Sequence, residues 1–334
     1  MKHKKINIAF IALAIIIACI IPFLGLKPYY IHLFSLSLIW VIMTQGLNVI
    51  QGYTGYVSIA QASFFGIGAY SSALLTTKVG LTFWMSLPLS IIIAAIVGYV
   101  VGIIALRTKG HYFSIITMAL CMVIWILMVN WDSLTGGESG ISNVVSPEPI
   151  LGIGFSTRTN YYYLILILTL ISIFVIYRLI HSKIGRALQT IRENEQLAQA
   201  IGISLFKYKL LAFIISASFG GLSGVLYAHY IGFVNPGPFT VDYSLNAILA
   251  VILGGSGTII GPIIGSFLMI FIPEYLRMAE EFRFVIYGLM LIVITIFLPK
   301  GIIHVLQILF TSVINNTKKF LYRKPVEKSF NSKI

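Results

Sequence analysis

Residues 83–106 read FWMSLPLSIIIAAIVGYVVGIIAL, a run that contains no charged side chain. A helix that crosses a bilayer needs about 20 mainly apolar residues, so this run is long enough to span a membrane. The whole chain shares this bias. Of its 334 residues, 58% are hydrophobic and only 10% are charged, whereas a soluble domain carries roughly 25% charged residues. We therefore expect an all-α polytopic membrane protein.

Nine apolar runs along the chain are predicted to form membrane spans. Their approximate bounds are 6–23, 29–50, 57–75, 83–106, 112–131, 161–180, 210–231, 244–272 and 284–298. The first run is expected to stay attached rather than to be cleaved as a signal, because its apolar stretch continues past Cys19 and no small-x-small cleavage site follows. These runs predict one transmembrane domain over residues 1–314, a bundle of about 9–10 helices, followed by a basic tail over 315–334.

The run at 244–272 is predicted to break at Gly254-Gly255-Ser256-Gly257 and to turn back. Lysine and arginine favour cytoplasmic loops, and nine simple crossings from an inner N-terminus would leave the basic tail outside. Two half-helices that enter and return, as a broken or re-entrant pair, remove this conflict and place both termini in the cytoplasm. Such a break is tolerated only where protein or a watery cavity satisfies the freed backbone groups, which predicts an enclosed bundle. One long, tilted helix is the alternative.

The spans lack the groups that several transport and enzyme mechanisms need. They contain no Asp or Glu, which disfavours a proton-coupled transporter, although a sodium-coupled carrier can use backbone carbonyls. No phosphate-binding loop of the form G-x-x-x-x-G-K-[ST] occurs, so energy from ATP would have to come from another chain. We expect no enzyme activity, no cofactor and no metal site. The net charge of +13 follows the membrane topology and does not indicate a nucleic-acid partner.

Residues 45–70, QGLNVIQGYTGYVSIAQASFFGIGAY, combine small residues with amide and hydroxyl side chains inside predicted spans. An unpaired amide in hydrocarbon costs several kcal/mol, so these side chains must face other helices or water. They fit either a tight helix interface or a path for a small polar or zwitterionic solute. With the glycines of the predicted break, the path candidates are Asn48, Gln51, Gly52, Gly55, Ser58, Gln61, Phe64, Tyr70, Gly254, Gly255 and Gly257.

Other glycines are spaced for close helix packing. Gly257, Gly261 and Gly265 are four residues apart and are expected on one helix face, where they would pack or let a path flex. A packing role is also expected for Gly220, Gly221 and Gly224. The segment 132–160 is predicted to be a long outer loop that could receive an external partner.

The polar segment 181–209 is the longest charged stretch before the tail and is predicted on the inner face. The spacing by three and four predicts one or two short helices along the membrane surface, with Gly202 as a stop. The residues with this spacing are Leu188, Ile191, Glu195, Leu197, Ala198 and Ile201. A solvated loop is the alternative, but the mixed charges of Arg186, Arg192 and Glu193 favour a docking platform for a cytoplasmic partner.

Several short motifs follow one another in a fixed order along the chain. They are NVIQGYTG at 48–55, LR at 106–107 with Gly110, TGG at 135–137, GRA at 185–187, IRENE at 191–195, YK at 208–209, GGSGT at 254–258 with GP at 261–262, and YG at 287–288. In this order they resemble the permeases of branched-chain amino-acid ABC importers, specifically the longer of the two permease types usually paired. The resemblance covers about Thr44 to Gly301.

The resemblance implies an assembly of several chains in a bacterial plasma membrane. A second permease would form the path with this chain, as a heterodimer, and an extracytoplasmic solute-binding protein would deliver leucine, isoleucine or valine. Two cytoplasmic ATPases would dock at Gly185, Arg186, Arg192, Glu193, Asn194, Glu195 and Gly202. Permeases for urea or short amides share the motifs, so import of urea or a short amide is the closest alternative to import of branched-chain amino acids. The residues also leave open a self-sufficient sodium-coupled carrier and a structural membrane scaffold.

Overall fold

The computed structural model describes residues 18–25, 27–149, 152, 154–155, 157–276, 288–289, 292 and 301–303. The predicted spans 6–23 and 284–298 lie mostly outside the described residues, and the tail 315–334 lies outside them entirely. The described part of the chain is helical apart from two strands of two residues each. The all-α class is therefore confirmed.

Long apolar helices dominate the described part of the chain. Those long and apolar enough to cross a membrane are α2 (Pro28–Thr54), α4 (Phe83–Ala105), α5 (His111–Asn130), α7 (Arg158–Ile180) and α10 (Leu205–Ile231). Shorter helices are α3 (Gln61–Thr77), α8 (Lys183–Glu193), α9 (Glu195–Ala200), α11 (Val241–Gly254) and α12 (Ile260–Tyr275). Single turns are η1 (Ile21–Leu24), α6 (Asp132–Thr135), η2 (Gly137–Ser139) and η3 (Gly237–Phe239). The chain is thus a multi-pass membrane protein.

Two predicted span boundaries are wrong by several residues. α3 begins at Gln61 rather than at residue 57, because Gly55 ends α2 with a φ of +80° and residues 55–60 form a connection. α10 begins at Leu205 rather than at residue 210 and so includes Lys209. A lysine is tolerated there because its ammonium group pairs with Glu195, a partner that hydropathy does not reveal.

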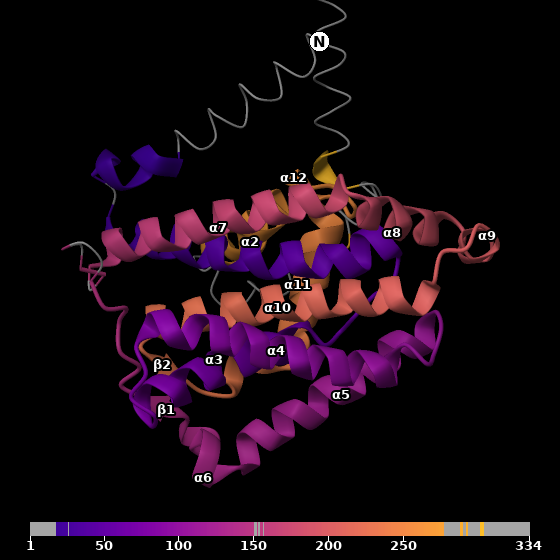
Figure 1. Cartoon of the computed structure of the whole chain (residues 1–334). Coiled ribbons are helices and arrows are strands. Elements are labelled where there is room, and N and C mark those ends of the chain that lie inside the picture. Colours follow the sequence, from indigo (N-terminus) through magenta and orange to yellow (C-terminus); the bar gives the residue numbers. More distant parts are fainter. Residues whose placement is uncertain are drawn as a thin grey trace, which may run out of the picture.

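α10 lies at the centre of the bundle. It packs against α2 on one side and against α3 and α4 on the other, while α7 covers the far side of α2 (Figure 1). Small residues make the close approach possible: a Cβ on Gly224 would overlap the carbonyl oxygen of Phe65 in α3, and a Cβ on Gly221 would lie 2.5 Å from the Cβ of Ala94 in α4. The packing role expected of these glycines is confirmed.

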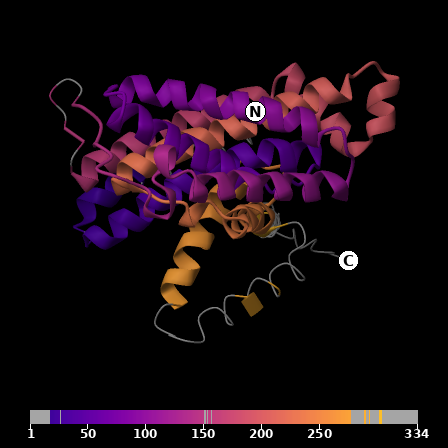
Figure 2. The same cartoon turned by 90° about the horizontal axis from the view of Figure 1, so that it is seen from below.

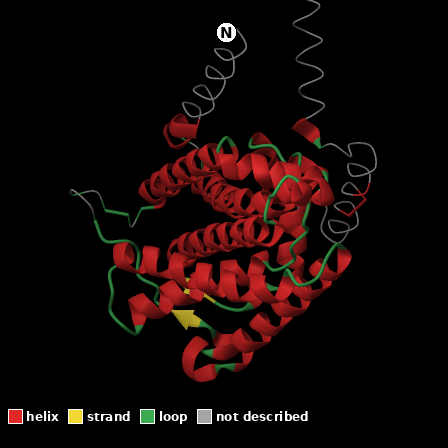
Figure 3. Cartoon of the chain, turned by 45° about the vertical axis from the view of Figure 1, so that its right-hand side comes forward, coloured by secondary structure: helices red, strands yellow, loops and turns green. Residues whose placement is uncertain are grey.

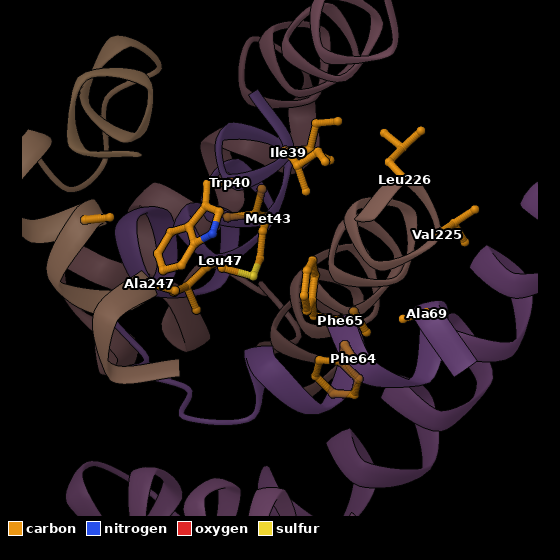
Figure 4. Packing of buried hydrophobic residues seen from close by; sticks show 14 of the residues in the cluster. Ile39, Trp40, Met43, Leu47, Phe64, Phe65, Ala69, Val225, Leu226 and Ala247 are labelled. Carbon is orange, nitrogen blue, oxygen red and sulfur yellow. The ribbon is translucent and has the colours of Figure 1, made fainter. Parts of the chain in front are cut away.

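Buried side chains from three helices fill the space between α2, α3 and α10 (Figure 4). The residues shown there include Ile39, Trp40, Met43, Leu47, Phe64, Phe65, Val225 and Leu226. α2 and α10 form the inner layer of the bundle, because 89% and 56% of the residues in their most apolar stretches are buried. α4 and α5 keep one apolar face exposed.

α11 and α12 form the helix pair predicted for residues 244–272, separated by the connection 255–259. Near the start of α11, Tyr243 packs on Trp40 in the middle of α2, and at the end of α12, Glu274 accepts a hydrogen bond from Tyr29 at the start of α2. The connection itself contacts the C-terminal half of α2. The segment therefore runs along α2 and returns, as the half-helix interpretation requires. Figure 2 shows α12, in gold, at one side of the bundle.

The predicted outer loop 132–160 contains short elements that the sequence did not indicate. Strand β1 (Ile141–Ser142) pairs antiparallel with strand β2 (Phe233–Val234) just after α10, and Figure 3 shows these strands in yellow at the edge of the bundle. Further along, the carboxylate of Glu148 accepts a hydrogen bond of 2.9 Å from the backbone N–H of Phe83, at the first turn of α4. The loop is therefore tied to the ends of α4 and α10.

The bundle has two ends that differ in charge. One, here named the Lys209 end, holds the connection 55–60 and helices α8 and α9; the other, the Arg158 end, holds the start of α7 and the loop after α5 (Figure 1). Basic residues at the Lys209 end are Arg107, Lys109, Arg178, Lys183, Arg186, Arg192, Lys207 and Lys209, and those described at the opposite end are Lys27, Lys78 and Arg158. The predicted orientation rests on this asymmetry.

Candidate translocation path and docking segment

One face of α2 carries a row of polar side chains that bond to α12 and to the connection 255–259. The hydroxyl oxygen of Thr44 lies 2.7 Å from that of Ser266, and the amide Nε2 of Gln45 donates to the carbonyl oxygen of Ile259 at 2.6 Å. We name this contact the α2 seam and define it by Thr44, Gln45, Asn48 and Gly52 of α2. Buried polar groups need such partners, and the seam supplies them for the hydroxyl group of Thr44 and the amide nitrogen of Gln45.

Asn48 holds the break between α11 and α12 with both ends of its side-chain amide. Its Nδ2 donates to the carbonyl oxygen of Thr258 at 2.8 Å, and its Oδ1 accepts from the backbone N–H of Gly257 at 2.9 Å. A broken helix leaves backbone groups without partners. Asn48, which is fully buried, is the hydrogen-bond partner of two such groups. Gly52 lies one turn later, and a Cβ there would overlap the Asn48 side chain and lie 2.5 Å from the nitrogen of Gly257.

The glycines of the break allow a close approach and unusual backbone angles. A Cβ on Gly254 would overlap the carbonyl oxygen of Gly261, and Gly255 and Gly257 have φ values of +126° and +77°. The prediction that Gly257 shares one helix face with Gly261 and Gly265 is wrong, because its left-handed conformation places it in the connection before α12. Gly261 and Gly265 do pack against α11.

Gln61, the first residue of α3, joins three helices. Its Nε2 donates to the carbonyl oxygens of Met43 in α2 at 3.0 Å and of Ser216 in α10 at 3.3 Å. Its Oε1 accepts a hydrogen bond of 2.9 Å from the hydroxyl group of Ser216. Gln61 is fully buried, so its amide is paired within this chain, like that of Asn48.

The other path candidates near α2 and α3 have different surroundings. Among the described residues, Gln51 Oε1 and the hydroxyl group of Tyr70 are buried without a hydrogen-bond partner. Ser58 accepts from a backbone N–H two residues later, Phe64 packs edge-on against a phenylalanine of α10, and Gly55 ends α2. Gln51 and Tyr70 are therefore the path candidates that have a buried side-chain oxygen available to form a hydrogen bond.

α8 and α9 form the segment predicted for docking, and each has its own N-terminal cap. The hydroxyl oxygen of Ser182 accepts from the backbone N–H of Gly185, and the side chain of Asn194 accepts from the backbone N–H three residues later at 3.0 Å. Gly202 follows α9 with a φ of +85°. The prediction of one or two short helices with a stop at Gly202 is confirmed, and the structure contains two.

The faces of α8 and α9 differ in part from the predicted ones. The buried positions among the spaced residues are Leu188, Ile191 and Ala198. Leu197 and Ile201 are 58% and 64% exposed. Arg186 and Glu193 are also exposed, so the segment presents charged and apolar side chains together.

Two of the docking candidates also contact the transmembrane helices. The guanidinium group of Arg192 donates to the carbonyl oxygen of Gly52. Glu195 accepts from the hydroxyl group of Tyr56 at 2.7 Å and forms an ion pair of 2.9 Å with Lys209. Burial disfavours the Glu195 carboxylate, but the hydrogen bonds from Lys209 and Tyr56 outweigh this effect and hold the pKa of Glu195 below its usual value.

Sequence patterns did not identify Tyr56 and Lys209 as a pair. The Lys209 ammonium nitrogen lies 2.6 Å from the Tyr56 hydroxyl oxygen and 4.1 Å from the centroid of the ring. A lysine at the edge of an apolar helix is the one signal in the sequence, since such a charge needs a partner. The partner is 153 residues away, so no local spacing can reveal it.

Comparison with known proteins gives the relatives of this chain. A family model described as "Branched-chain amino acid transport system / permease component" matches residues 29–295. The high-affinity branched-chain amino acid transport system permease proteins LivM of Salmonella typhimurium and Escherichia coli K12 are each 32% identical, over 88% of this chain and 74% of their own length. LivH of Escherichia coli K12 is 24% identical, over 80% of this chain and 92% of its own. No solved structure matches.

The matched region extends from the start of α2 past the end of α12 and so includes the α2 seam, the docking segment and the broken helix pair. The family match and the alignment with LivM each cover most of the chain. The chain therefore belongs to the family of permease components of branched-chain amino acid transport systems.

Proposed function

We propose that this chain is the permease subunit of an ATP-driven importer that carries leucine, isoleucine and valine across the bacterial plasma membrane. The observation that supports this proposal most strongly is the match to relatives named as high-affinity branched-chain amino acid permeases. The five long helices of the described part contain no Asp or Glu, so they offer no carboxylate to carry a proton. The energy for import would come from partner ATPases.

The α2 seam is the proposed wall of the path. It consists of amide, hydroxyl and glycine groups without net charge, which suits a zwitterionic amino acid. In other transporters, half-helix ends and unwound backbone bind the solute, and the break at 255–259 supplies such groups. Gln51 and Tyr70, whose buried polar atoms have no partner among the described residues, are the positions best able to bind a passing solute.

The proposed assembly has partners at both ends of the bundle. LivM and LivH relatives both match this chain, which supports pairing with a second permease as a heterodimer. Two ATPases would dock on α8 and α9, where Arg186 and Glu193 lie exposed beside Leu197. A solute-binding protein would approach the Arg158 end.

The proposed orientation places the Lys209 end in the cytoplasm. Lysine and arginine are enriched in cytoplasmic loops, and the basic residues of the described part lie mainly at this end. Both termini would then be cytoplasmic, with residues 1–314 as one permease domain and 315–334 as a basic tail.

Uptake by the complete importer in liposomes tests the proposed function. The vesicles would hold this chain, its partner permease and the ATPases, with the binding protein added outside. We expect ATP-dependent uptake of labelled leucine that isoleucine and valine compete away and that urea does not. Uptake of urea instead would replace the proposed solute, and leucine uptake driven by a sodium gradient without ATP would support a carrier.

The docking segment is tested by reversing one charge at a time. Arg186→Glu or Glu193→Arg should abolish uptake and co-purification of the ATPases while the protein stays folded in the membrane. Lys27→Glu at the Arg158 end is the control for ATPase binding and should leave co-purification of the ATPases unchanged. Normal uptake by both docking variants would contradict the proposed docking site.

A further inference from the structure

Helices α8 and α9 contact the last turn of α2 and the connection that follows it, at one point each. Arg192, near the end of α8, donates to the carbonyl oxygen of Gly52. Glu195, at the start of α9, accepts from the hydroxyl group of Tyr56 at 2.7 Å. The two contacts come from either side of the bend between α8 and α9, so the docking segment is bonded to residues 52–56 at both of their ends.

The carbonyl oxygen of Gly52 needs a partner from outside its helix. α2 ends at Thr54, and the last four carbonyl groups of a helix have no partner within it. The backbone N–H groups that follow α2 bond to Ile50 and Gln51 instead. Arg192 fills the vacant position with a cation, which the C-terminal end of a helix dipole favours.

The same region leads directly to the break between α11 and α12. Asn48, one turn before Gly52, bonds to Gly257 and Thr258. The guanidinium group of Arg192 also lies beside Gly257, because a Cβ on this glycine would overlap its Nη1 atom. The docking segment, the end of α2 and the break in the re-entrant pair therefore meet at Arg192.

We propose that Arg192 is a positioning residue that couples movement of the α8–α9 segment to the break at 255–259. The inference rests on the proposed function, because ATPases docked on this segment would supply the movement. When the segment shifts, Arg192 and Glu195 carry the end of α2 with it. Asn48 then passes the displacement to the break, where the path opens or closes. Arg192 performs this role without touching the solute.

Arg178 offers a matched control outside the docking segment. It lies in the last turn of α7 and is exposed, and within the described residues its guanidinium group has no hydrogen bond or ion pair. A variant of Arg178 therefore removes the same charge and the same donors without breaking the contact with α2 or altering the proposed docking residues.

The first test measures uptake and ATP hydrolysis together in the reconstituted importer. For Arg192→Gln we expect hydrolysis to continue while the leucine imported per ATP falls about tenfold, the size expected when a charge-assisted hydrogen bond is lost. Arg192→Lys, which keeps a cationic donor, should restore part of the ratio. Arg178→Gln should leave the ratio within about twofold of the unmodified importer.

A second measurement follows the break directly and does not depend on transport. Spin labels at Ile260→Cys, at the exposed start of α12, and at Ile96→Cys, on the exposed face of α4, report the position of the re-entrant pair in a Cys19→Ser background. We expect nucleotide trapping to change this distance in the unmodified importer and in Arg178→Gln, but not in Arg192→Gln. A residue that only caps α2 would leave the change intact.

The outcomes separate this inference from the proposed function. An unmodified importer without ATP-dependent uptake would contradict the proposed function. An active importer in which Arg192→Gln keeps both its uptake per ATP and its nucleotide-dependent distance change would overturn the coupling role alone. If Arg192→Gln fails to fold, Arg192→Lys is tested in its place. Normal leucine import per ATP and a normal nucleotide-dependent change in the label distance would then contradict the inference.

Discussion

Helices α2 and α5 are both apolar enough to cross a membrane, yet their surroundings are opposite. In the most apolar stretch of α2, 89% of the residues are buried, compared with 22% in α5. α2 carries Thr44, Gln45 and Asn48 on one face and pairs them with the re-entrant helices. The outward face of α5 presents Ile115 and Ile126, which are 56% and 49% exposed. Position in this bundle therefore follows the need to pair polar groups, and the purely apolar face is left for lipid.

The largest expected effect is the loss of folded protein from a side chain added inside the α2 seam. Gly52→Val would force a branched side chain into Asn48 and the backbone of Gly257, and neither can move without opening the break. We expect almost no monodisperse protein after extraction into detergent, measured by size-exclusion chromatography. Ile126→Val on α5 is the control and should behave like the unmodified chain. Normal yield of Gly52→Val would show that the seam is loosely packed.

The next largest effect is expected from Asn48→Leu, which keeps the volume of the side chain but removes its hydrogen bonds. The N–H of Gly257 and the carbonyl oxygen of Thr258 would lose their partner, at about 1–3 kcal/mol for each group. We expect uptake per folded molecule to fall about tenfold with most of the protein still folded. Gln61→Leu should act in the same direction.

These two leucine variants also distinguish the two interpretations of the seam. Uptake and folded yield are measured on the same membranes, by labelled leucine and by fluorescence-detected chromatography. A loss of folded protein with normal uptake by the remainder would mean that Asn48 and Gln61 serve packing only.

A smaller effect is expected from acid on the contact between α9 and α10. The pKa of Glu195 is held below its usual value of about 4.5 by Lys209 and Tyr56, so its contribution to stability is present above that pH. This contribution is lost as the pH falls through the lowered pKa. Thermal unfolding between pH 7 and pH 3.5 should show an acid-dependent decrease on the order of 1 °C that Glu195→Gln lacks.

Glu193→Gln is the matched control for the acid effect, because Glu193 is exposed and its carboxylate forms no ion pair within the described residues. Its unfolding should follow that of the unmodified chain at every pH. Equal acid sensitivity in the Glu195 and Glu193 variants would show that the ion pair with Lys209 contributes nothing.

The smallest effect is expected on the outward face of α5. Val123→Leu and Ile126→Leu exchange one apolar side chain for another on an exposed face, and such changes usually stay within about 0.5 kcal/mol. Uptake and melting temperature should both be unchanged. A clear loss of uptake at either position would indicate that this face meets a protein partner rather than lipid.

Much of the fold could be predicted because hydropathy and charge act over long stretches. Apolar length gave the spans, and the distribution of lysine and arginine required residues 244–272 to turn back, which α11 and α12 confirm. The pairing of β1 with β2 could not be predicted, since strands of two residues have no periodicity. The start of α10 could not be placed either, because a hydropathy criterion rejects Lys209 unless its partner Glu195 is known.

The candidate site could be predicted as a set of residues but not as a set of contacts. The need of Asn48 and Gln61 for partners follows from their burial in apolar helices. The partners themselves are backbone groups such as that of Thr258, 210 positions from Asn48. Because every residue has the same backbone groups, the sequence does not indicate which of them is the partner. The inward contact of Arg192 is hidden for the same reason, so a charge in a docking segment gives no indication that it faces the membrane helices.

The central claim is that this chain forms a path for its solute but depends on other proteins for energy. Liposomes that contain the purified chain alone test it most directly, with internal labelled leucine measured over time in the presence of sodium, proton and leucine gradients. We predict no accumulation above the external concentration until the partner permease, ATPases, binding protein and ATP are all supplied. Accumulation of leucine against its gradient by the chain alone would contradict the claim.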